Sequence, residues 1–113
     1  PRVTTTATLT DALLEMSRGR MGMTAVVDES LAVRGIFTDG DLRRAIEKGQ
    51  DLRGTAIRDI MSANPRTIGA DRLAAEAVEI MERGKVTQLL VVDEGKKLLG
   101  ALNIHDLFRG KVV

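Results

Sequence analysis

Apolar residues recur at helical spacing in two stretches of the chain. The capping pair Thr8 and Asp11 predicts a helix that begins there and ends at Gly19. Its apolar face holds Leu9, Ala12, Leu13 and Met16. The same spacing predicts a second helix that is closed by Gly84. Its apolar face holds Leu73, Ala77, Ile80 and Met81.

Short continuous apolar runs predict strands that form two hairpins, each with a turn of Asp, Glu and Ser or Gly residues. The hairpin strands are expected at residues 23–27, 33–37, 88–92 and 98–102. A helix should follow each hairpin, at 39–48 and 104–108. Asn64 and Pro65 interrupt a short helical turn at 57–61 and precede another short strand at 66–68.

The chain contains an internal repeat. A shift of 65 residues aligns 12–44 with 77–109 without a gap and gives twelve identities. We therefore expect a first repeat at 1–50 with a truncated opening strand, a polar linker at 51–56, and a second repeat at 57–113. Because the chain opens at Pro1 within a repeat, we expect it to be part of a longer protein.

Composition excludes several classes of protein. Of the 113 residues, 43% are hydrophobic and 29% are charged, as in ordinary globular domains. The net charge of +1 disfavours a nucleic-acid partner, and no apolar run is long enough for a membrane span. The chain has no Cys, so disulfides, thiol nucleophiles and thiolate metal sites are excluded. A reducing, cytoplasmic location is expected.

The repeated β-α-β-β-α unit resembles the pair of cystathionine-β-synthase (CBS) domains. The matching motifs are Asp59-Ile60-Met61, Val91-Val92-Asp93 and Gly35-Ile36-Phe37-Thr38-Asp39-Gly40-Asp41. In the second copy, Asn103 stands where the family prefers Thr or Ser. The resemblance implies an α+β fold with two β-α-β-β-α repeats related by a pseudo-two-fold axis.

A narrower resemblance is to the C-terminal part of D-arabinose-5-phosphate isomerases, carried by residues 35–44, His105-Asp106-Leu107 and the ending 110–113. It implies an N-terminal sugar-isomerase domain as the fused partner. That domain would convert ribulose 5-phosphate to arabinose 5-phosphate for octulosonate and lipopolysaccharide synthesis. The 113 residues themselves offer no set of nucleophile, base and orienting group, so we expect no catalysis by this part.

The candidate ligand site lies where the strand ending at Phe37 delivers Thr38 to a helix start. Free backbone N–H groups there favour an anion, and Gly40 allows close approach. Asp41 could accept from ribose hydroxyls while Thr38 and Arg44 bind phosphate, and the resemblance implies similar roles, with Asp41 on ribose and Thr38 near phosphate. The first site comprises Gly35, Ile36, Thr38, Gly40, Asp41 and Arg44. A weaker second site comprises Gly100, Asn103, Asp106 and Arg109.

An alternative interpretation needs no ligand, because Thr38 and Asp41 also form an ordinary helix cap and Asp41–Arg44 an ordinary i,i+3 pair. Asp39 and Asp41 diverge on a helix, so no metal site is expected, and His105 is expected to have no chemical role.

Two functions therefore remain open. One is a regulatory module without a resident cofactor that senses an adenine or cytidine nucleotide, or a nucleotide-sugar. The other is a structural oligomerisation module without a ligand. In either case we expect a homodimer formed through apolar residues of the long helices, Leu13, Met16, Val78 and Ile80.

Overall fold

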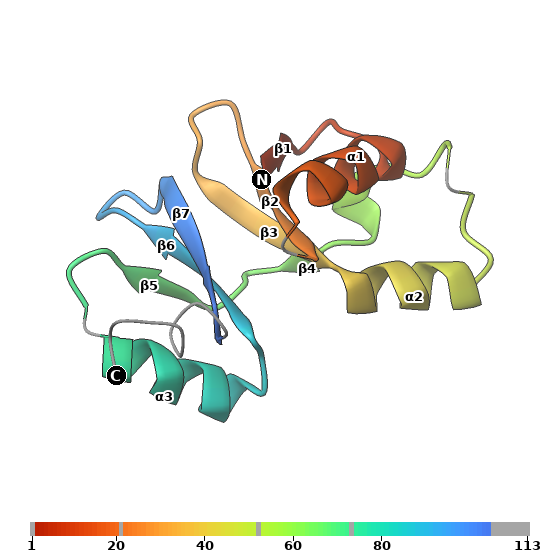
Figure 1. Ribbon diagram of the computed structural model, residues 1–113. Coiled ribbons are helices and arrows are strands. Elements are labelled where there is room, and N and C mark those ends of the chain that lie inside the picture. Colours follow the sequence, from red (N-terminus) through yellow and green to blue (C-terminus); the bar gives the residue numbers. More distant parts are fainter. Residues whose placement is uncertain (1, 21, 52, 73, 105–113) are drawn as a thin grey trace. The chain divides into compact units, whose positions relative to one another are not determined.

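The computed structural model describes residues 2–20, 22–51, 53–72 and 74–104, and the chain divides into two compact units (Figure 1). The first unit is Pro1–Asn64 and the second is Pro65–Val113. Helices and strands are mixed in both units, as the sequence predicts. None of the helices in the described part of the chain is long and apolar enough to cross a membrane.

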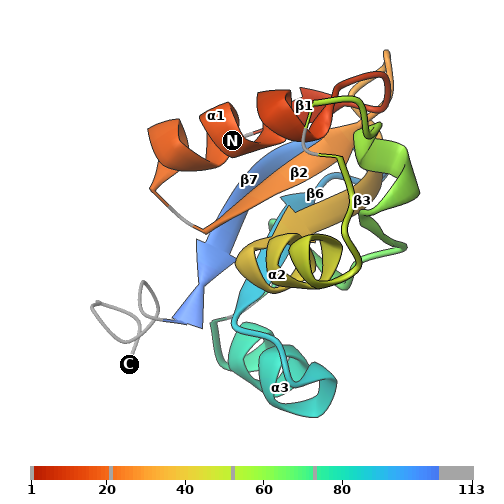
Figure 2. The same cartoon turned by 90° about the vertical axis from the view of Figure 1, so that its right-hand side faces the viewer.

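The first unit is a four-stranded sheet with helices packed on it. Its elements are β1 (Arg2–Thr4), α1 (Leu9–Gly19), β2 (Met23–Val27), β3 (Val33–Thr38), α2 (Asp39–Glu47), the 3₁₀ turn η1 (Ile57–Asp59) and β4 (Ser62–Ala63). The strand order is β1-β2-β3-β4, with β1 parallel to β2 and the other neighbours antiparallel. Figure 2 shows α1 lying along β2, and α2 follows directly from the end of β3.

The second unit repeats the first three strands and the first helix of this plan. Its elements are β5 (Thr67–Gly69), α3 (Ala74–Gly84), β6 (Gln88–Val92) and β7 (Leu98–Asn103). β5 is parallel to β6, and β6 is antiparallel to β7. The helix predicted at 104–108 lies, beyond Ile104, outside the described residues.

The repeat extends to the hydrogen bonds of the hairpin turns. In the first copy, Oδ1 of Asp28 accepts from the N–H groups of Ser30 and Ala32. In the second copy, Oδ1 of Asp93 accepts from Gly95 and Lys97 at the same offsets. Both hairpins also carry a register shift near the end of the first strand. The 65-residue offset therefore relates two copies of one local structure.

Helices α1 and α3 end at Gly19 and Gly84, as the sequence predicts, and the left-handed position that closes each helix falls one residue later. Both glycines belong to their helices, and the left-handed residues that follow them are Arg20 at φ 56° and Lys85 at φ 54°. The Arg20 N–H donates to the Met16 carbonyl and closes the last turn of α1. A Cβ at Gly84 would meet the Nε atom of Arg66, which belongs to a flexible and exposed side chain.

Each unit has its own apolar core, and the predicted core methionines Met16 and Met81 are both buried. The first core holds Val3, Ala7, Leu9, Ala12, Met16, Val26, Phe37 and Ile57. The second holds Ile68, Ala77, Met81 and Leu89. Met16 therefore stabilises its own unit and cannot form part of a dimer surface as expected.

Residues 57–63, which the sequence repeat assigns to the second copy, pack with the first unit. Ile57 is fully buried in the first core, and β4 pairs with β3. The predicted boundary at 57 is thus a boundary of the sequence repeat, whereas the compact units meet after Asn64. The opening strands β1 and β5 have three described residues each and pair in parallel with β2 and β6, respectively.

Candidate functional site

The start of α2 is a complete capping box. The Thr38 N–H donates to Oδ2 of Asp41 at 2.9 Å, and the Asp41 N–H donates to Oγ1 of Thr38 at 3.3 Å. The Asp39 N–H donates to the Gly22 carbonyl at 3.0 Å. These three N–H groups therefore already have hydrogen-bond acceptors within the chain.

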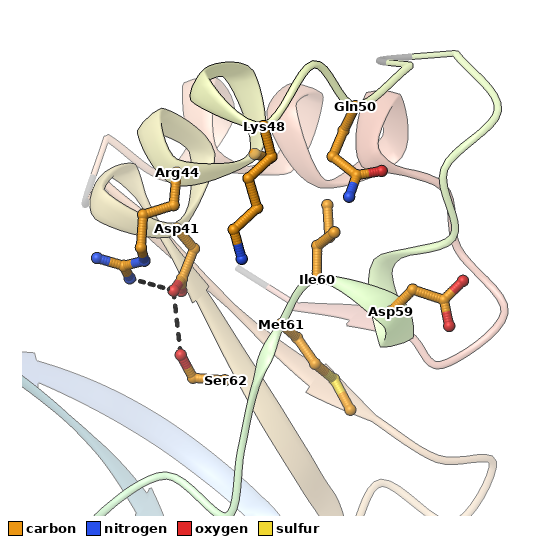
Figure 3. Close-up of a pocket in the computed structure, with 9 residues that line it drawn as sticks. Asp41, Arg44, Lys48, Gln50, Asp59, Ile60, Met61 and Ser62 are labelled. Atoms are coloured by element: carbon orange, nitrogen blue, oxygen red, sulfur yellow. Dashed lines mark hydrogen bonds and ion pairs between the residues drawn. The ribbon is translucent and has the colours of Figure 1, made fainter.

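Asp41 is a buried carboxylate with only 6% of its surface exposed. Its Oδ1 accepts from Nη2 of Arg44 at 2.5 Å and from the hydroxyl of Ser62 at 3.0 Å, as the dashed lines of Figure 3 show. With Thr38 on Oδ2, both carboxylate oxygens have donors from the chain itself. Both oxygens of the buried carboxylate therefore accept hydrogen bonds, and its charge is paired with the exposed guanidinium of Arg44.

Gly35 allows the segment before Asn64 to approach β3 closely. A Cβ at Gly35 would overlap Sδ of Met61 and lie 2.9 Å from the Ser62 carbonyl oxygen. Gly35 is paired with Ala63 in the sheet, so this contact fixes the position of β4 on β3. Because Ser62 belongs to β4, Gly35 indirectly sets the hydrogen bond between Ser62 and Asp41.

A pocket of about 310 Å³ opens between α2 and the segment 59–62 (Figure 3). All of its lining belongs to the first unit. The lining residues are Asp41, Arg44, Ala45, Lys48, Gln50, Asp59, Ile60, Met61 and Ser62. We call this cavity the Asp41 pocket.

The structure brings only part of the predicted first site to this pocket. Asp41 and Arg44 line it, but the other predicted residues, Gly35, Ile36, Thr38 and Gly40, do not. A Cβ at Gly40 would make only ordinary contacts at 3.6 Å, so no steric requirement for glycine exists there. Thr38 acts on the pocket through Asp41, which it orients.

The predicted second site can be followed only in part. Gly100 and Asn103 lie on β7, whereas Asp106, Arg109 and the neighbouring His105 lie outside the described residues. No atom of the described chain comes within 4 Å of a Cβ added at Gly100. With the described residues, Gly100 therefore makes no close contact like that of its counterpart Gly35.

Several pocket residues carry chemistry that the sequence did not reveal, namely Lys48, Gln50, Asp59 and Ser62. Lys48 could have been found, because it follows Asp41 by seven residues and so falls on the same face of a helix. Asp59 and Ser62 were hidden by their assignment to the second copy. Only the tertiary contact of η1 and β4 with the first unit shows that they belong to this site.

The pocket is mostly polar, with carboxylates, cations, an amide and a hydroxyl, and its apolar lining is aliphatic. Such a lining suits a small ligand that presents hydroxyl groups, an anionic group and a flat or apolar part. Among the described residues, no three His, Asp or Glu side chains gather closely enough to hold a metal ion.

Comparison with known proteins places this geometry in context. The family profile of the CBS domain matches residues 1–48 and again 57–112. Over all 113 residues the chain is 49% identical to the arabinose 5-phosphate isomerase KdsD of Pseudomonas aeruginosa and 44% identical to that of Escherichia coli K12. It spans about a third of these relatives, 35% and 34% of their lengths.

Solved structures with the same fold include a CBS domain protein of Pyrobaculum aerophilum in complex with AMP. It has a TM-score of 0.89 at 23% identity, covering 97% of this chain and 84% of that one. A signal-transduction protein with CBS domains from Burkholderia ambifaria has a TM-score of 0.85 at 28% identity, covering 96% and 79%.

Proposed function

The chain belongs to the CBS domain family, and from that premise we propose that it is a regulatory module that binds a nucleotide in the Asp41 pocket. The observation that carries the proposal is a buried carboxylate that lines an open pocket. A carboxylate accepts strongly from vicinal hydroxyls such as those of ribose, because both of its oxygens can take hydrogen bonds.

Binding requires an exchange of donors at Asp41. The hydroxyl of Ser62 and the guanidinium of Arg44 occupy Oδ1 in the free protein. Ribose hydroxyls can replace the Ser62 hydroxyl and share the carboxylate with Arg44, so the buried carboxylate is not left unsatisfied, while Ser62 turns to ligand or water. This exchange keeps the cost of entry low, since an unpaired buried carboxylate would be strongly unfavourable.

The pocket volume favours a compact ligand. About 310 Å³ lies at the lower end of the roughly 300–1,000 Å³ typical of small-molecule sites. We therefore favour an adenine or cytidine nucleoside monophosphate over a larger nucleotide-sugar. Ile60 and Met61 supply the apolar surface against which a base could lie. The copy-two residues Gly100, Asn103, Asp106 and Arg109 are proposed as a weaker second site.

The wider role follows from the relatives. Because the whole chain is 44–49% identical to the corresponding part of KdsD isomerases, we propose that it regulates a fused sugar-isomerase domain. The regulated reaction would be the conversion of ribulose 5-phosphate to arabinose 5-phosphate, which feeds octulosonate and lipopolysaccharide synthesis. A cytoplasmic location fits that role.

The test is calorimetric titration of AMP and CMP into the wild type, Asp41→Ala and Asp106→Ala. Loss of the carboxylate in copy one should weaken binding by one to two powers of ten, from roughly 1.5–3 kcal/mol for a charged hydrogen-bonding group. The Asp106→Ala change should have much less effect. Titrations are made at a temperature where circular dichroism shows every variant folded. Equal affinities for the wild type and Asp41→Ala would contradict the proposed site.

A second candidate function is a structural module that fixes the oligomer of the whole protein without a ligand. It is favoured by the complete set of intrachain donors on Asp41. A melting-temperature screen separates the two, because a ligand at 100 times its Kd adds about 2.7 kcal/mol of stability. No shift with any nucleotide would favour the structural role.

A further inference from the structure

Lys48 differs from the other cation that lines the Asp41 pocket. The guanidinium of Arg44 is paired with Asp41, so its charge is largely balanced. The ammonium group of Lys48 has no hydrogen-bond or ion-pair partner among the described residues. Of the two cations in the described lining, Lys48 is therefore the one that makes no ion pair, and Asp59 is a lining carboxylate that makes none either.

Helix geometry directs Lys48 toward Asp41. Asp41, Arg44 and Lys48 follow one another at spacings of three and four residues, so they lie on one face of α2 and its C-cap. Side chains on a helix lean toward its N-terminus, so the Lys48 side chain leans back in the direction of Asp41. In Figure 3 it extends from the end of α2 toward the segment 60–62.

The start of α2 is a less favourable position for an anion than its end. The N–H groups of Thr38, Asp39 and Asp41 are hydrogen-bonded within the chain. Asp41 itself carries a negative charge that would repel a phosphate at short range. The pocket is thus polarised, with an acceptor for hydroxyl groups near the start of α2 and a free cation at its end.

We infer that Lys48 binds the phosphate group of the ligand and so selects phosphorylated over unphosphorylated molecules. This inference rests on the proposed function and specifies its ligand as a phosphate monoester. The hydroxyl groups of the ligand bind at Asp41, and the phosphate lies toward the C-terminal end of α2. Arg44 stays paired with the carboxylate of Asp41, so it contributes little to the preference for phosphorylated ligands.

The experiment compares AMP with adenosine, by calorimetric titration of the 113-residue wild type, Lys48→Gln and the control Arg43→Gln. Arg43 is an exposed cation on the same helix that does not line the pocket. Lys48→Gln should weaken AMP binding about tenfold at low salt and leave adenosine binding within twofold of the wild type. Arg43→Gln should change neither.

The outcomes separate the inference from the proposed function. If the wild type binds both AMP and adenosine, and Lys48→Gln does not alter the ratio of the two affinities, the role of Lys48 is overturned. The proposed nucleotide site is not affected by that result. If neither AMP nor adenosine binds, the nucleotide proposal fails. The phosphate role of Lys48 is then tested by titrating ribose 5-phosphate and ribose in place of AMP and adenosine. A preference for ribose 5-phosphate that Lys48→Gln abolishes then supports the phosphate site, and no binding of either sugar overturns it.

Discussion

Ser62 donates its hydroxyl to Oδ1 of Asp41 at 3.0 Å and so joins β4 to the first turn of α2 across 21 positions of the sequence. Ser62 lies on the segment that leads directly into the second unit, which begins at Pro65. The same carboxylate is the group that we propose for the ligand hydroxyls. Occupation of the Asp41 pocket therefore competes with one of the bonds that hold β4 in place.

Replacement of Ser62 tests this bond. Ser62→Ala should lower the free energy of unfolding by about 1 kcal/mol, since a partly exposed hydrogen bond to a charged group is lost. Urea denaturation measures the change. Ser17→Ala, at an exposed position of α1, is the control and should alter stability by only a few tenths of a kcal/mol. An equal effect of the two substitutions would show that the bond contributes nothing.

The two capping boxes provide a matched comparison of Asp41 with Asp11. Both are the third residue of a helix and both bond to the capping Thr. Asp11 is exposed, whereas Asp41 is buried and also holds Ser62 and Arg44. Asp11→Ala should cost about 0.5–1 kcal/mol and Asp41→Ala about 2 kcal/mol, measured by the same denaturation. Costs of the same size would mean that Asp41 acts only as a cap.

Gly35 and Gly100 occupy equivalent positions with different surroundings. Gly35→Ala should destabilise the protein by about 1–3 kcal/mol, because the new methyl group meets Met61 and the Ser62 carbonyl. Gly100→Ala should be neutral or stabilise by a few tenths of a kcal/mol, because a Cβ there meets no atom of the described residues within 4 Å. Thermal melts of both variants check this. The close approach of β4 would be refuted by two equal melting temperatures.

Asp28 should give a pH dependence below pH 4. Hydrogen bonds, first from the Ser30 hydroxyl and then from the N–H groups of Ala32 and Ser30 and from Arg34, lower its pKa to about 2, against an opposing effect of partial burial. A carboxyl whose pKa is lower in the folded state stabilises fully above its unfolded value of 3.8. That contribution is lost as pH falls toward 2.

Asp28→Asn, which keeps an acceptor for the turn, should therefore lose less stability than the wild type between pH 4 and pH 2. Denaturation curves across that range measure the two slopes. Glu29→Gln is the control, because the Glu29 side chain makes no hydrogen bond with the described part of the chain. Parallel curves for the wild type and Asp28→Asn would exclude this role of Asp28.

The homodimer that the sequence predicts through the long helices can be tested at Leu14, which neighbours Leu13 on α1 and is 61% exposed. Sedimentation at high micromolar concentration should show a species of twice the 12.2 kDa chain mass. Leu14→Glu should weaken association at least tenfold, whereas Leu99→Glu, exposed by 57% on β7, should not. A wild type that sediments at 12.2 kDa would contradict the dimer.

The sequence predicted the elements well because their signals are local. Neighbouring residues are enough to predict the capping pair at Thr8 and the strand Met23–Val27. The repeat itself is enough to align the two copies. The resemblance to the CBS family was also carried by contiguous motifs, and the family profile confirms it.

The site was predicted less completely because it depends on tertiary contacts. Asp41 and Arg44 were identified from a motif, but the sequence did not show that the hydroxyl and N–H of Thr38 both bond to Asp41. The positions of Ser62 and Asp59 in the pocket could not be predicted without knowing that the chain after residue 56 packs back against β3. No local pattern specifies that return.

The placement of residues 57–63 in the first unit has a consequence for how such a protein can evolve. The unit of duplication begins at residue 57 and the second unit of folding at Pro65, so the two are out of phase by the eight residues 57–64. A recombination event at the repeat boundary would carry away η1 and β4, and with them Ile57 of the first core and Ser62 of the Asp41 pocket. Selection should therefore keep the two copies as an inseparable pair, even where only one of them binds a ligand.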